Sequence, residues 1–130
     1  MIICPLSTIY NVSKNGKEYA FRLNLNVYRN THHSILGKAK ISYKRELLAL
    51  NPHIETLRYD KPVSLYFVLY KPSSRRIDRA NICSIVEKFA CDVLTECGVW
   101  DDDNDEHIIS TTYITGGVDR ENPRIELNIK

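Results

Sequence analysis

The segment 62–97 decides the fold and reads PVSLYFVLYKPSSRRIDRANICSIVEKFACDVLTEC. Its first part, Pro62–Tyr70, is rich in Val, Leu and aromatic residues and predicts a central β-strand that Lys71-Pro72 ends. Apolar residues then recur at the spacing of one helix face, and Gly98 follows as a C-cap glycine: these residues are Ile82, Ile85, Val86, Phe89, Val93 and Cys97. The segment therefore predicts a strand followed by an amphipathic helix.

The flanking sequence extends this pattern on both sides. Four further strands are expected at Ser7–Val12, Glu18–Asn26, Ile108–Thr115 and Pro123–Ile129. An Asn-Gly turn at residues 15–16 joins the first two of these strands, and a turn at Gly116-Gly117 joins the last two. Lys38–Leu50 predicts a basic amphipathic helix that Asn51-Pro52 ends. The order of elements predicts an α+β fold, with a mixed β-sheet and two main helices packed on it.

Length and composition favour one soluble domain, residues 1–130. A chain of 130 residues with 43% hydrophobic and 26% charged residues has a typical globular composition. Its longest uncharged apolar stretch, Pro62–Tyr70, is about half of what a membrane span needs, and residues 1–13 have no signal-peptide pattern. The four cysteines lack zinc-ligand spacing, which indicates reduced thiols and a cytoplasmic location.

Two charge clusters flank the helix expected from residue 82. Four basic residues, Lys71, Arg75, Arg76 and Arg79, surround the single acid Asp78. Five acids then lie within residues 101–106, although the net charge of the whole chain is only +2. Such clusters are either two solvated loops or a surface that binds a polyanion through metal ions, and composition alone leaves both open.

The acidic segment does not match a calcium-binding EF-hand loop. Asp101, Asp103 and Asp105 fit its first three ligand positions, but the sixth position is Glu106 in place of glycine and the twelfth is Thr112 in place of glutamate. Clustered carboxylates repel one another unless a divalent cation holds them together. Magnesium prefers one or two carboxylates together with water and phosphate oxygens, so it would suit an acidic pocket beside a nucleic-acid backbone. Taken alone, however, such a run of charges is more typical of a solvated loop after a helix.

A family resemblance adds to this reasoning. Its motifs are RRIDRAN at 75–81, Glu87-Lys88, DVL at 92–94 and GVWDDD at 98–103, followed by Gly116-Gly117 and RIELNI at 124–129. Together with a polar stretch at 26–33, expected as a loop, they resemble the RusA family of Holliday junction resolvases over about Leu25–Lys130. The resemblance implies a magnesium-dependent endodeoxyribonuclease that acts in DNA recombination and repair. As a homodimer, it would make paired nicks in four-way DNA junctions.

The resemblance also implies roles for individual residues. The catalytic set is Asp78, Lys88, Asp102 and Asp103. Asp78 and Asp103 would hold the Mg²⁺ ion together with Asp102 or Glu87, and Lys88 would stabilise the charge that develops on phosphate. Basic residues are expected to contact the DNA backbone of the branched substrate: Arg29, Lys38, Arg75, Arg76 and Arg79.

Two alternatives stay open. The family has a second aspartate at the helix start, where this chain has Ala80, and about one extra helical turn separates Asn81 from Lys88. These departures favour a catalytically impaired DNA-binding module of the same fold. The remaining alternative is an acidic domain that binds calcium or a protein and has no role on DNA.

Overall fold

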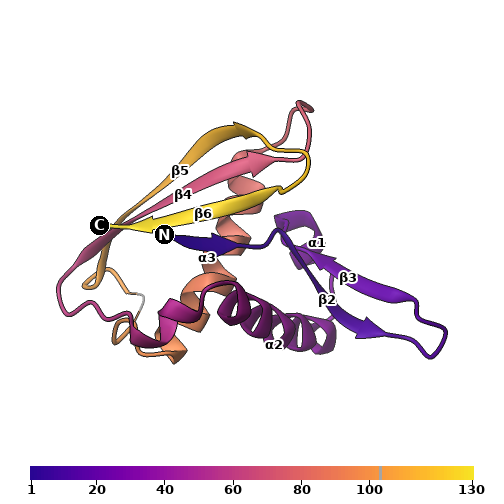
Figure 1. Ribbon diagram of the computed structural model, residues 1–130, viewed down its shortest axis with the longest axis horizontal. Helices are drawn as coiled ribbons and strands as arrows, with labels where there is room; N and C mark the ends of the chain where they lie inside the picture. Colours follow the sequence, from indigo (N-terminus) through magenta and orange to yellow (C-terminus); the bar gives the residue numbers. More distant parts are fainter. Residues whose placement is uncertain (103) are drawn as a thin grey trace.

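A computed structural model describes residues 1–102 and 104–130, and Figure 1 shows its arrangement. The strands are β1 (Ile2–Cys4), β2 (Ser7–Val12), β3 (Glu18–Arg22), β4 (Val63–Lys71), β5 (Ile108–Val118) and β6 (Arg124–Ile129). The helices are α1 (Leu25–Arg29), α2 (His33–Leu50), a 3₁₀ turn at Pro52–Thr56 and α3 (Arg79–Glu96). The α+β prediction is confirmed, as is the pair of main helices.

The main sheet has the strand order β1-β6-β4-β5, and β4 is parallel to β5 but antiparallel to β6. It is therefore a mixed sheet, with β4 as an inner strand. Alternate side chains of β4 (Leu65, Phe67 and Leu69) are buried against the helices. Phe89 of α3 stacks on Phe21 of the β2–β3 hairpin at 5.6 Å between ring centroids, so the core ties α3 to that hairpin as well as to the sheet.

The β4–α3–β5 unit determines where the charged segments lie. Because β4 and β5 are parallel, the helix that connects them, α3, runs in the opposite direction to both strands. Its start therefore lies near the ends of the two strands, and its end lies near their starts. Arg79 at the start of α3 donates a hydrogen bond from Nη1 to Thr115 Oγ1 (2.8 Å), near the end of β5. The backbone N–H of Val63, which begins β4, bonds to the carbonyl of His107 (2.7 Å), which follows the acidic segment. The basic cluster and the described residues of the acidic segment therefore lie near opposite ends of α3 (Figure 1).

The prediction of a turn at Gly116-Gly117 is wrong. Both glycines belong to β5, whose partner is β4, so β5 and β6 are not neighbours. The ladder is irregular here, since Leu69 pairs with Thr115 while Tyr70 pairs with Gly117. A Cβ on Gly116 would lie 2.7 Å from Val68 Cγ1, so close packing of two strands explains this glycine and no turn is needed.

The N-terminal half also differs from expectation. The strand expected to reach Asn26 ends at Arg22, because the Asn24 side chain accepts a hydrogen bond from Asn26 N–H and begins α1. Helix α2 begins at His33, five residues before the expected start, with His32 as its cap. Ile41, which was expected on the apolar face of this helix, is 71% exposed and so does not belong to the buried face.

Candidate nucleic-acid interface and carboxylate site

Asp78 lies at the start of α3 and is exposed. Its carboxylate oxygen Oδ1 accepts a hydrogen bond from the backbone N–H of Ala80 (3.0 Å), which makes it the N-cap. A carboxylate at this end of a helix is also favoured by the helix dipole. Asp78 therefore has a structural role of its own, and any metal ligation by this residue comes in addition to capping.

A basic hollow adjoins the start of α3. It has a volume of about 420 Å³ and lies between the β2–β3 hairpin, the β4–α3 loop and the β5–β6 loop. Among the described residues, three cationic side chains line it, namely Arg22, Lys71 and Arg75, and no carboxylate does. Arg22 is not among the residues that the sequence predicts to contact DNA. Its only signal is position, because it follows the buried Phe21 in β3 and so points to the opposite face of that strand.

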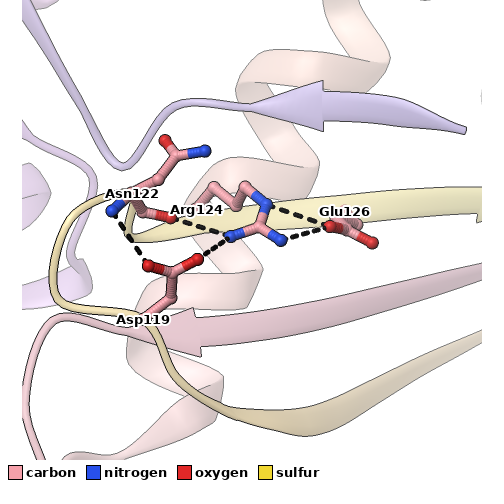
Figure 2. Close-up of polar contacts among 4 residues, drawn as sticks. All are labelled: Asp119, Asn122, Arg124 and Glu126. Carbon is pink, nitrogen blue, oxygen red and sulfur yellow. Dashed lines mark hydrogen bonds and ion pairs between the residues drawn. The ribbon is translucent and has the colours of Figure 1, made fainter.

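The loop that closes one side of this hollow is held by Arg124 (Figure 2). Arg124 donates hydrogen bonds to Asp119 Oδ2 (2.8 Å) and Glu126 Oε2 (2.7 Å), and its guanidinium lies 4.3 Å from the centre of the Tyr70 ring. The backbone N–H of Asn122 donates to Asp119 as well, and these bonds lower the pKa of the Asp119 carboxyl. These bonds hold the β5–β6 loop in place, and Pro123 of this loop forms part of the wall of the hollow.

Glu87 and Lys88 face different elements, as expected for neighbours on an ideal helix. Glu87 accepts a hydrogen bond from the hydroxyl of Tyr113 in β5. Burial raises the pKa of Tyr113, and the bond to Glu87 raises it further. Lys88 is exposed, with its Nζ 5.8 Å from the centre of the Tyr28 ring of α1. Glu87 is thus engaged by the sheet, whereas Lys88 faces solvent.

The acidic segment follows α3. Asp101 and Asp102 are exposed, and Asp101 Oδ2 lies 3.9 Å from His107 Nε2. Asp101 and His107 line a second hollow of about 430 Å³ together with Arg58 and Asp60. Asp103 lies outside the described residues. Within residues 1–102 and 104–130, no three His, Cys, Asp or Glu side chains gather closely enough to hold a metal ion.

The expected site residues therefore fall into separate groups. Asp78 and Asp102 lie at opposite ends of α3, which at 18 residues is about 27 Å long. Arg75, Arg76 and Arg79 lie in the β4–α3 loop or at the helix start, beside Asp78. Two further basic residues are exposed on other helices: Arg29 ends α1, and Lys38 lies in the first half of α2.

Comparison with known proteins adds no family assignment. No protein-family model matches the chain, and no curated protein is significantly similar to it. In the described part of the chain, no helix combines the length and the apolar character that a membrane span requires.

Proposed function

We propose that the protein is a magnesium-dependent, structure-selective endodeoxyribonuclease that resolves four-way DNA junctions, similar to the RusA resolvases. The observation that carries this proposal is the concentration of cations around an exposed carboxylate at the start of α3. Arg22, Lys71 and Arg75 line a hollow next to Asp78, and Arg79 adjoins it. Such a surface would bind the phosphate backbone of DNA independently of sequence and bring it to Asp78.

The separation of Asp78 from Asp102 favours a homodimer. A metal ion shared by the two ends of α3 requires a second chain, because one helix length lies between them. The outer edge of β5 supports such an assembly, since this 11-residue strand has no charged residue and no proline to block pairing. Antiparallel pairing of β5 with its copy would bring the α3 start of one chain towards the acidic segment of the other.

The donor set fits magnesium, because carboxylates are its preferred protein ligands. Asp78 from one chain, with Asp103 and Asp102 from the other, would hold the ion. When bound, magnesium lowers the pKa of a coordinated water, which supplies the nucleophile. Lys88 is exposed and would neutralise charge on the attacked phosphate. Glu87 is the less suitable ligand, since Tyr113 already binds its carboxylate.

A mixing experiment tests the activity and the shared site together. The wild-type protein should nick a synthetic four-way junction in the presence of magnesium, and neither Asp78→Asn nor Asp103→Asn alone should do so. Mixed heterodimers of these two variants contain one intact site if the two aspartates act across the dimer, so single-strand nicking should return. If mixing restores nothing, the site is not shared; if the wild type does not nick, the nuclease proposal is wrong.

A DNA-binding module without catalysis is the second candidate. Ala80 favours it, because alanine replaces a metal-binding aspartate, and so does the engagement of Glu87 by Tyr113. This candidate predicts retardation of the junction on a gel without any nicking. For either function we propose a cytoplasmic location, where the four free thiols would stay reduced. The acidic-domain alternative predicts no retardation even at low salt.

A further inference from the structure

We propose that the basic hollow binds a single unstacked nucleotide, with the phosphate on its cationic rim and the base against its apolar wall. The inference rests on the proposed DNA substrate but does not require that the DNA be cleaved. The volume of about 420 Å³ lies within the range of ligand pockets, roughly 300–1,000 Å³. A nucleotide matches both features of this hollow, because its phosphate is an anion for the cationic rim and its base is a flat ring whose faces pack against apolar side chains.

The rim supplies the positive charge. Lys71 ends β4 and donates a hydrogen bond from Nζ to the carbonyl of Arg75 (3.3 Å), so these two residues are held on the same side. Arg22 comes from β3, where it pairs in register with Ser7 of β2. None of the ion pairs among the described residues involves these three cations. They are therefore available to an external phosphate.

The wall supplies the apolar contact. Leu23, Ile77 and Ile82 line the hollow, and Ile77 is 40% exposed although it is a large aliphatic residue. A charged phosphate gains nothing from contact with an apolar wall, so the hollow is better matched to a nucleotide than to a simple anion. Packing of a base face against these aliphatic side chains leaves its hydrogen-bonding edge unread, so it tolerates any base identity, which suits a protein that selects DNA by its shape.

The hollow lies beside the candidate catalytic residue Asp78. Ile77 lines it and is adjacent in sequence to Asp78, so a nucleotide held there places its neighbouring phosphate near the candidate catalytic carboxylate. Extracting a base from a continuous duplex costs a few kcal/mol, and the cost is least where stacking is already interrupted. A branch point therefore fills the hollow more readily than a duplex does, which would make the protein structure-selective.

Fluorescence of 2-aminopurine placed at the branch of a four-way junction tests this inference, because the signal rises when the base unstacks. Measurements use calcium in place of magnesium to prevent cleavage. We expect the wild type to raise the fluorescence several-fold. Ser7→Phe should fill the hollow and remove the rise, whereas Ser7→Thr, which keeps the residue small, should retain it. Arg22→Gln with Arg75→Gln should reduce junction affinity at least tenfold, and Arg45→Gln on α2 should not.

Competition distinguishes the possible ligands. Thymidine 5′-monophosphate should compete with the junction for the hollow, and inorganic phosphate at the same concentration should not. Equal competition by phosphate would reduce the hollow to an anion site and overturn the inference, as would junction binding without any rise in fluorescence. The inference and the nuclease proposal fail separately. Unstacking without nicking in magnesium contradicts only the nuclease, and nicking without unstacking contradicts only the nucleotide site.

Discussion

The side-chain amide of Asn51 is paired with the backbone of Ile3 as a neighbouring strand would be. Asn51 Oδ1 accepts from the Ile3 N–H (2.8 Å), and Asn51 Nδ2 donates to the Ile3 carbonyl (2.8 Å). Asn51 also donates to the Leu47 carbonyl at the end of α2, and it is 1% exposed. One buried amide therefore closes the β1 edge of the sheet and joins it to α2.

Replacing Asn51 with alanine should destabilise the protein strongly. The substitution leaves the Ile3 N–H and carbonyl without a side-chain partner in a partly buried setting, and each unsatisfied group costs about 1–3 kcal/mol. We expect the free energy of unfolding in urea to fall by roughly 2–4 kcal/mol. Asn11→Ala, at an exposed position of β2, is the matched control and should stay within about 0.5 kcal/mol of wild type. Equal effects of the two substitutions would contradict a special role for Asn51.

The opposite edge of the sheet should mediate dimerisation. Within the part of the chain that the structure describes, no strand pairs with the outer edge of β5, and two large apolar side chains of this edge strand are exposed, Ile109 (64%) and Ile114 (39%). Lysines at both positions would place charges on the edge and oppose pairing with a copy. We expect Ile109→Lys/Ile114→Lys to weaken the dimer at least tenfold in sedimentation equilibrium. Ile41→Lys/Leu50→Lys introduces the same charges on exposed apolar residues of α2 and should leave the dimer intact.

The sequence allowed the local elements to be predicted, because their signals are local. The apolar spacing of α3 and the Val- and aromatic-rich β4 each identify one element from neighbouring residues alone. Strand order is different in kind. Gly116-Gly117 suggested a turn, and only the tertiary packing of Val68 explains why a glycine lies within β5. Asn51 was predicted to end a helix, but nothing in the local sequence indicated its hydrogen bond to Ile3, which is 48 residues away.

The candidate site shows the same limit. The cluster of Lys71 and Arg75 is visible in the sequence because the two residues are close together in it. Arg22 joins them only through the fold, since the β2–β3 hairpin returns to the end of β4. The separation of Asp78 from Asp102 likewise follows from the 18-residue α3 helix and the parallel pairing of β4 with β5. Charge clusters of residues that are close in sequence could be predicted, but the distances between segments that are far apart in sequence could not.

Replacing Gly116 with alanine tests the close approach of β5 to β4. The added Cβ would lie 2.7 Å from Val68 Cγ1 and 2.8 Å from the Tyr70 ring, so the strands must separate or the side chains must shift. Overpacking of this kind costs about 1–3 kcal/mol, and the melting temperature should fall accordingly. A second substitution, Val68→Ala, should recover part of the loss in the Gly116→Ala background.

Gly37 provides the matched control for this substitution. It lies within α2, and an added Cβ would meet no other atom within 4 Å. Alanine is the better helix former, so Gly37→Ala should raise stability by about 0.5–1 kcal/mol. A loss of stability in both variants would contradict the assignment of Gly116 to a crowded position.

Stability should also decrease at alkaline pH because of two buried thiols. Burial raises the pKa of Cys4 to about 12 and that of Cys83 to about 11, although Arg79 acts in the opposite direction on Cys83. An unfolded thiol has a pKa of about 8.5, so the unfolded chain releases these protons first. The stability they provide is therefore complete below about pH 8.5 and is lost as the pH rises towards 11 and 12.

Urea unfolding at pH 8 and pH 10.5 measures this effect. The free energy of unfolding of wild type should fall between the two values, and Cys4→Ala/Cys83→Ala should reduce the decrease because neither position can then ionise. Comparing decreases, and not absolute stabilities, removes the cost of the two shortened side chains at either pH. An unchanged decrease in the double variant would mean that other groups, such as tyrosines and lysines, cause the whole alkaline effect.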